Sequence, residues 1–255
     1  MSKQKLIMCF ILALGPVCAI SDPFPMSASF ENITISKDSL TDSPQLSNLK
    51  DLPLKIFDSS TSSNLPLLVY ISGDGGLNSF SESLCMSLSQ KGIPVVFLDA
   101  KKYFWRSKTP EETTASLTLI IETYLKIWKR DRFILTGFSF GASVVPFIVN
   151  RLSSDIKKEM WHALLISPDQ TSDFEIHLSD MLNLGISRGK YDVIKEIHSI
   201  ENHRLTAVFG SDESEEVRQS FRETGMRVEI LQGNHHFDSN DQSLIDLIMN
   251  ETNDK

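Results

Sequence analysis

The chain has 255 residues, of which 41% are hydrophobic, and this suits one α/β domain with a substantial core. The formal net charge is −8, and the basic residues form no stripe along the sequence. This charge argues against nucleic acid, or an anionic membrane surface, as a direct docking partner.

The N-terminus has the pattern of an export signal. Lys3 and Lys5 precede a short apolar run over residues 6–14, and small residues follow up to Ala19. We therefore expect a signal peptide over residues 1–19 that is cleaved near Ala19. Residues 20–50 are rich in Ser, Pro, Asn and Asp, which predicts a poorly ordered lead with one edge strand at 33–35. Residues 51–255 would then form the folded domain.

From about residue 52, apolar runs typical of buried strands alternate with helical spacing. Strands are predicted, in chain order, over 66–73, 93–100, 132–137, 161–168, 204–211 and 226–233. Helices are predicted through Phe80 to a stop at Gly92, from a cap at Thr109 to residue 128, over 140–152, near 215–223 and over 242–250. This alternation predicts an α/β fold with a mostly parallel sheet, helices on both faces, and ligands at the carboxyl ends of the strands.

The stretch "GFSFG" places Ser139 between Gly137 and Gly141, after a predicted strand and before a predicted helix. This is the G-x-S-x-G elbow, in which a strained turn lifts the serine hydroxyl above the sheet. The residues two before and two after the serine must be small, because larger side chains would collide with the turn. We therefore interpret Ser139 as a nucleophile; a plain glycine turn is the alternative.

A serine nucleophile needs a base, and the base needs an acid to orient it. In folds with this elbow, the histidine follows the last strand and the acid follows the strand before it. The stretch 232–238 contains His235 and His236; we choose His235 as the base and keep His236 as the alternative. Asp212 is the predicted acid, and Glu213 is its alternative.

The loop 72–76 is rich in glycine and follows the first strongly apolar strand. We predict an oxyanion hole that uses the backbone N–H of Asp74 or Gly75, together with that of Phe140. The loop lacks the lysine ending of a P-loop and the spacing of a dinucleotide site. The sequence also offers no obvious set of metal ligands, so we predict neither a cofactor nor a metal ion.

The loop 99–112 combines cations with aromatic rings. One interpretation is that the rings pack on the core. The other is a substrate-binding wall, in which Tyr103 and Trp105 contact an acyl or lipid group and Arg106 or Lys108 meets a phosphate.

Several motifs together resemble the bacterial VirJ/AcvB virulence-protein family, in its short VirJ-like form. The stretches "YISGDGG", "KKYFWRSKTPEET", "LTGFSFGASVVPFIVNRL", "FEI" and "GNHHFD" occur in the order and spacing of that family. The resemblance covers residues 52–250 and implies an α/β-hydrolase fold, with Ser139 as the nucleophile and the histidine pair as the source of the base.

The same resemblance implies a periplasmic serine hydrolase that cleaves the aminoacyl ester of aminoacylated phosphatidylglycerol, notably the lysyl ester. It also implies that this phospholipid is met at the membrane surface, and that components of type IV secretion are further partners. Two alternatives stay open: a non-catalytic periplasmic adaptor of that secretion system, and a generic periplasmic carboxylesterase.

Overall fold

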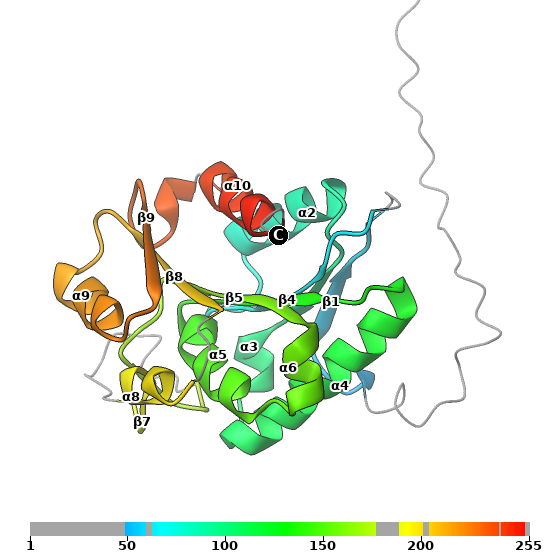
Figure 1. The fold of residues 1–255 in the computed structure, drawn as a ribbon, viewed down its shortest axis with the longest axis horizontal. Coiled ribbons are helices and arrows are strands. Elements are labelled where there is room, and N and C mark those ends of the chain that lie inside the picture. Colours follow the sequence, from blue (N-terminus) through cyan, green and yellow to red (C-terminus); the bar gives the residue numbers. More distant parts are fainter. Residues whose placement is uncertain (1–48, 60–62, 177–188, 201–203, 240, 253–255) are drawn as a thin grey trace, which may run out of the picture. The chain divides into compact units, whose positions relative to one another are not determined.

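The computed structural model describes residues 49–59, 63–176, 189–200, 204–239 and 241–252 (Figure 1). The predicted signal peptide over 1–19 and the predicted edge strand at 33–35 lie outside the described residues, as does the lead over 20–50 apart from its last two residues. All the described residues belong to one compact unit, Leu40–Lys255.

Seven strands of the described chain form one sheet in the order β1-β3-β2-β4-β5-β8-β9. They are β1 (Leu54–Phe57), β2 (Leu67–Ile71), β3 (Val95–Leu98), β4 (Phe133–Phe138), β5 (Met160–Ile166), β8 (Leu205–Gly210) and β9 (Arg227–Leu231). All neighbouring strands run parallel except β1, which pairs antiparallel with β3 at one edge. The mostly parallel sheet predicted from the sequence is therefore confirmed.

Helices cover both faces of this sheet (Figure 1). On one face lie α2 (Ser79–Gln90) and α10 (Gln242–Glu251), and on the other lie α4 (Pro110–Trp128), α5 (Phe140–Arg151) and α6 (Ser154–Glu159). Each face has its own apolar core, because alternate residues of a strand point to opposite sides. In β2, Leu67, Val69 and Ile71 join one core, whereas Leu68 and Tyr70 join the other.

The remaining elements are short or peripheral. They are α3 (Ala100–Tyr103), a two-stranded sheet of β6 (Thr171–Ser172) and β7 (Tyr191–Asp192), α8 (Val193–His198), α9 (Glu215–Glu223) and the 3-10 helix η1 (Phe237–Ser239). None of the helices in the described ranges is both long and apolar enough to cross a membrane.

The start of α4 shows how local sequence sets a boundary. The Glu112 N–H donates to the Thr109 hydroxyl at 3.1 Å, and the Thr109 N–H donates to the Glu112 carboxylate at 2.8 Å. Pro110 occupies the first helical position, where its missing N–H costs nothing. This is the capping arrangement that the sequence predicts.

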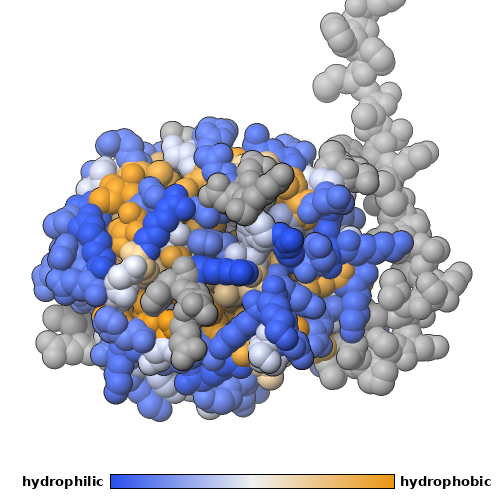
Figure 2. All heavy atoms as spheres, in the orientation of Figure 1, coloured by the Kyte–Doolittle hydropathy of each residue, from blue (hydrophilic) through white to orange (hydrophobic). Residues whose placement is uncertain are grey.

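Hydrophilic residues occupy much of the face shown in Figure 2, with hydrophobic residues exposed between them. This surface agrees with the acidic, charged composition of the chain. In parallel α/β sheets, ligands bind at the carboxyl ends of the strands.

Candidate active site

Ser139 occupies the turn between β4 and α5 with φ 51° and ψ −116°. A positive φ is strained for a residue with a Cβ, and it is uncommon outside functional sites and turns. The Ser139 N–H donates to the Ile166 carbonyl at 2.8 Å, which ties the turn to the end of β5. Ser139 is partly buried and not enclosed in the core.

The two glycines around Ser139 are required because no larger side chain fits at either position. A Cβ on Gly137 would lie 2.3 Å from the carbonyl of Gly141, and a Cβ on Gly141 would lie 2.3 Å from the carbonyl oxygen of Ile71. No side chain fits at such distances. The steric reason for the G-x-S-x-G pattern therefore holds in this structure, and the turn has the geometry of a nucleophile elbow.

The order of the strands brings three further loops beside this turn. β4, β5, β8 and β9 are consecutive neighbours in the sheet. Their carboxyl ends lead to Ser139, Ser167, Glu213 and His235 respectively. The carboxyl end of β8 packs closely on the histidine loop, since a Cβ on Gly210 would lie 2.3 Å from the Asn234 carbonyl oxygen.

Glu213 is the carboxylate that contacts the imidazole. Its Oε2 lies 3.0 Å from His235 Nδ1. Its Oε1 accepts from the Ser167 hydroxyl at 2.7 Å and from the Gly210 N–H at 2.7 Å. Three partners therefore fix both oxygens of one partly buried carboxylate.

The sequence predicts Asp212 as the acid, and the structure differs on this point. Asp212 is exposed, its carboxylate accepts from the Ser211 hydroxyl at 2.9 Å, and its N–H donates to the Gly233 carbonyl. The turn after β8 directs the next side chain, Glu213, inward over the strand end. The alternative acid of the sequence is thus the one that meets His235.

Electrostatics in this cluster favour a charged carboxylate and a basic imidazole. Burial opposes ionisation of Glu213, but the hydrogen bonds from His235, Ser167 and the Gly210 N–H together hold its pKa below the ordinary value. The hydrogen bond with Glu213 raises the pKa of His235 against the opposing effect of partial burial. The negative charges of Glu213, Asp169 and Asp74 raise the pKa of His235 further.

His236 lies in a different setting. Its ring contacts Phe138 and Phe80, with centroids 5.2 and 6.0 Å apart, and it lies 5.4 Å from the ring of His235. Partial burial and the neighbouring His235 lower its pKa. Within the described chain no carboxylate hydrogen-bonds its ring, so the orientation expected of a catalytic base belongs to His235.

Ser139 and His235 have neighbours in common. The ring of Phe138, next to Ser139, has its centroid 5.3 Å from that of His235. Gly73 lies against the elbow, where an added Cβ would be 3.5 Å from Ser139 Cβ, and the charge of Asp74 acts on His235. In the described chain the Ser139 hydroxyl has no hydrogen bond to either imidazole; such bonds often tighten only in the complex with substrate.

The loop predicted to supply an oxyanion hole borders this cluster. Asp74 and Gly75 are exposed in a turn closed by the Gly76 N–H, which donates to the Gly73 carbonyl at 3.0 Å. Phe140 begins α5, so its N–H belongs to the first turn of the helix, which has no intrahelical acceptor. Gly73, at the start of this loop, lies against Ser139, and the role of the Asp74, Gly75 and Phe140 N–H groups as oxyanion donors stays a prediction.

The aromatic loop after β3 is partly a packing element. Tyr103 is 7% exposed, and its hydroxyl donates to Ser116 at 2.8 Å, which leaves little of the ring for a substrate. Trp105 is 55% exposed, and Arg106 is exposed as well. Of the predicted wall residues, Tyr103 therefore packs on the core, whereas Trp105 and Arg106 stay candidates for substrate contact.

The neighbouring Phe104 connects this loop with the elbow. Its ring makes an edge-to-face contact with that of Phe140, with centroids 5.0 Å apart. The loop is also held to the chain segment after β6, because the Lys108 N–H donates to the Phe174 carbonyl and the Ile176 N–H donates to the Phe104 carbonyl. The loop therefore has a fixed place at the rim of the candidate site.

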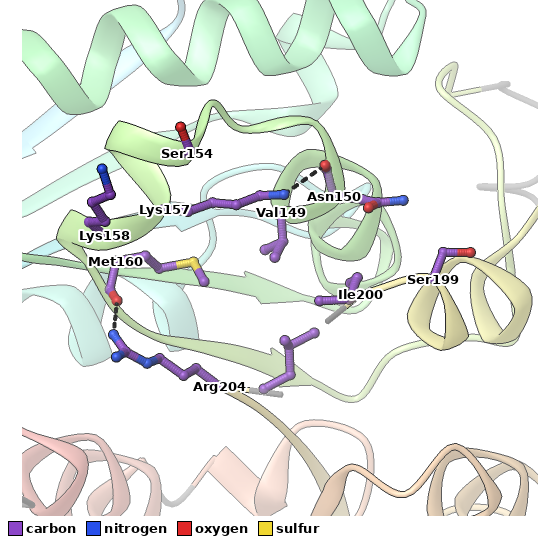
Figure 3. Close-up of a pocket in the computed structure, with 10 residues that line it drawn as sticks. Val149, Asn150, Ser154, Lys157, Lys158, Met160, Ser199, Ile200 and Arg204 are labelled. Carbon is purple, nitrogen blue, oxygen red and sulfur yellow. Dashed lines mark hydrogen bonds between the residues drawn. The ribbon is translucent and has the colours of Figure 1, made fainter. Parts of the chain in front are cut away.

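A cavity of about 510 Å³ lies elsewhere, at the amino ends of β5 and β8 (Figure 3). The Lys157 Nζ donates to the Asn150 carbonyl at 2.9 Å there, and Arg204 donates to the Met160 carbonyl at 2.9 Å. This is the edge of the sheet away from Ser139, so the cavity is not part of the candidate active site. No group of three or more metal-ligating side chains gathers in the described ranges.

The fold and the elbow define the chain as an α/β-hydrolase in architecture. Its structure is similar to a lipase-esterase related protein from Clostridium acetobutylicum, with TM-score 0.56, 13% identity, and coverage of 78% of this chain and 98% of that one. It is also similar to Est1E from Butyrivibrio proteoclasticus, with TM-score 0.54, 11% identity, and coverage of 77% and 90%. Proline iminopeptidase from Mycobacterium smegmatis gives TM-score 0.54 at 9% identity, with coverage of 78% and 94%. These likenesses are of fold.

The sequence itself shows the family to which the chain belongs. The family model described as bacterial virulence protein (VirJ) matches residues 66–255, and the chain belongs to this VirJ family. A search of curated proteins gives no match. The family resemblance expected from the motifs is therefore confirmed.

Proposed function

We propose that the chain is a serine hydrolase of carboxylic esters, with Ser139 as nucleophile, His235 as base and Glu213 as the acid that orients the base. The observation that carries this proposal is the 3.0 Å contact between His235 Nδ1 and Glu213 Oε2, formed beside a serine in a strained elbow. A carboxylate on Nδ1 leaves the other ring nitrogen free to accept a proton.

The proposed reaction follows from these positions. As the Ser139 oxygen attacks the ester carbonyl, the His235 Nε2 takes the hydroxyl proton, and Glu213 stabilises the resulting imidazolium. In this proposal, the N–H groups of Phe140 and of Asp74 or Gly75 donate hydrogen bonds to the oxygen that becomes negative. The imidazolium then gives its proton to the departing alcohol. Water, activated by the same imidazole, releases the acid and restores the serine.

For the substrate, we propose the aminoacyl ester of an aminoacylated phosphatidylglycerol. Membership of the VirJ family supports this choice. The charges of Asp74 and Asp169 also support it, since both raise the pKa of His235 and therefore act at the reacting centre. The same carboxylates would attract the ammonium group that every aminoacyl ester carries next to its carbonyl. Export to the periplasm and contact with type IV secretion components are proposed on family membership alone.

The test uses vesicles that contain lysyl- or alanyl-phosphatidylglycerol and the full chain without its signal peptide. The proposal predicts release of the free amino acid by the wild type and not by Ser139→Ala. Turnover of short-chain nitrophenyl esters with no release from the lipids would instead favour a generic carboxylesterase. No turnover of either substrate by a folded protein would favour the adaptor.

A further inference from the structure

Ser167 is a buried serine at the carboxyl end of β5, between the elbow and the Glu213 turn. Its side chain is 1% exposed, and its N–H donates to the Val208 carbonyl at 2.7 Å. Its φ is 52°, the left-handed region that favours glycine. A strained, buried polar residue persists only where its surroundings hold it, and such residues gather at functional sites.

The hydroxyl of Ser167 contacts both partners of the acid–base pair. It donates to the Glu213 Oε1 at 2.7 Å and lies 3.3 Å from the carbonyl oxygen of His235. The Gly210 N–H is the other donor to the same carboxylate oxygen, at 2.7 Å. Ser167 is therefore one of two groups that hold the far oxygen of Glu213 while the near oxygen faces the imidazole.

The segment that carries Ser167 is also attached to the nucleophile. Two residues later, the Asp169 N–H donates to the Ser143 hydroxyl at 2.9 Å. Ser143 lies one helical turn after Ser139, and its own N–H donates to the Ser139 carbonyl at 3.1 Å. One short segment thus connects the elbow with the carboxylate and the histidine loop.

We propose that Ser167 is a positioning residue, whose hydroxyl fixes the Glu213 carboxylate so that His235 keeps the orientation needed to reach Ser139. The inference rests on the proposed function. Ser167 touches no reacting atom; it acts through Glu213 and through the backbone of the histidine loop. A hydrogen bond to a charged carboxylate is among the stronger ones in proteins, so its loss is measurable.

The experiment compares Ser167→Ala with the wild type on a nitrophenyl ester. We expect kcat to fall about 10- to 100-fold with KM changed less than about twofold. Ser89→Ala is the matched control, because Ser89 is another buried serine, whose hydroxyl donates to the Met86 carbonyl within α2. Ser167→Gly is a second variant that also removes the hydroxyl but relieves the positive φ, so it folds even if Ser167→Ala does not.

A double-mutant cycle distinguishes a role that acts through Glu213 from a purely structural role. If Ser167 acts through Glu213, Ser167→Ala lowers kcat less than about twofold further in a Glu213→Gln background. An equal loss in both backgrounds, or wild-type kcat in both Ser167 variants, would overturn the proposal.

A readout without substrate keeps this inference separate from the proposed function. In wild type we expect a downfield proton NMR signal from the His235 Nδ1–H, protected by Glu213. The signal should broaden by exchange with water in both Ser167 variants and stay unchanged in Ser89→Ala. An unchanged signal in the Ser167 variants contradicts the positioning role. Absence of hydrolysis by the wild type would contradict only the proposed function.

Discussion

The Glu213 carboxylate lies 3.0 Å from His235 Nδ1, and the adjacent Asp212 faces Ser211 instead. Two neighbouring acids in one turn therefore have different surroundings. They form a matched pair for testing which carboxylate serves the base.

Glu213→Gln should lower kcat for ester hydrolysis by roughly 10³- to 10⁴-fold, because an amide at this place favours the wrong imidazole tautomer. Asp212→Asn should stay within about twofold of wild type, since its side chain is exposed and has no contact with the imidazole. Steady-state kinetics on a nitrophenyl ester measure both. A large loss in Asp212→Asn with a small one in Glu213→Gln would reverse the assignment.

The acid limb of the pH profile should reflect the raised pKa of His235. A general base must be neutral, so kcat/KM falls as the pH drops through that pKa. The hydrogen bond with Glu213 raises the pKa of His235, so the decline should occur above the ordinary value of about 6.5. In Glu213→Gln the midpoint of this decline should move to a lower pH, because the side chain that raises the pKa of His235 has lost its charge. A midpoint that does not move would contradict the coupling.

The two histidines should respond differently to substitution. His235→Ala should lower kcat by roughly 10⁴-fold or more, as expected for loss of the base of a triad. His236→Ala should cost much less, because within the described chain its ring contacts aromatic side chains and no carboxylate. The reverse ranking would make His236 the base, as the alternative from the sequence has it.

Substitution of an elbow glycine should lower the free energy of unfolding of the protein. Gly137→Ala places a Cβ 2.3 Å from backbone atoms that cannot move aside, so we expect a loss of roughly 3 kcal/mol or more in the free energy of unfolding. Gly75→Ala is the control, since an added Cβ there meets nothing within 4 Å. Denaturant unfolding followed by circular dichroism measures both. Equal stabilities would show that the turn relaxes.

Much of the fold could be predicted from the sequence because buried parallel strands are continuous apolar runs. β4, β5, β8 and β9 all lie within a few residues of their predicted limits. The short elements were missed for a physical reason. β1 has one buried residue of four, and α6 and α8 have six residues each, too short for a helical pattern to stand out.

Those parts of the candidate site that depend only on the order of the strands and loops could be predicted from the sequence. The serine between two glycines and the histidine after the last strand follow from position alone. The choice between Asp212 and Glu213 depends on the direction in which a turn points each side chain, and adjacent acids carry no signal of that. The role of Ser167 could not be predicted from the sequence either. A serine at the end of an apolar strand is common, and only its positive φ and its hydrogen bond to Glu213 set it apart.

Labelling of the full chain with a fluorophosphonate tests whether Ser139 is a nucleophile activated by His235. We expect one covalent adduct, located on Ser139 by peptide mass spectrometry, that forms far more slowly in His235→Ala and is absent in a folded Ser139→Ala variant. An adduct on another residue, or a wild-type protein that is folded and stays unlabelled, would contradict it.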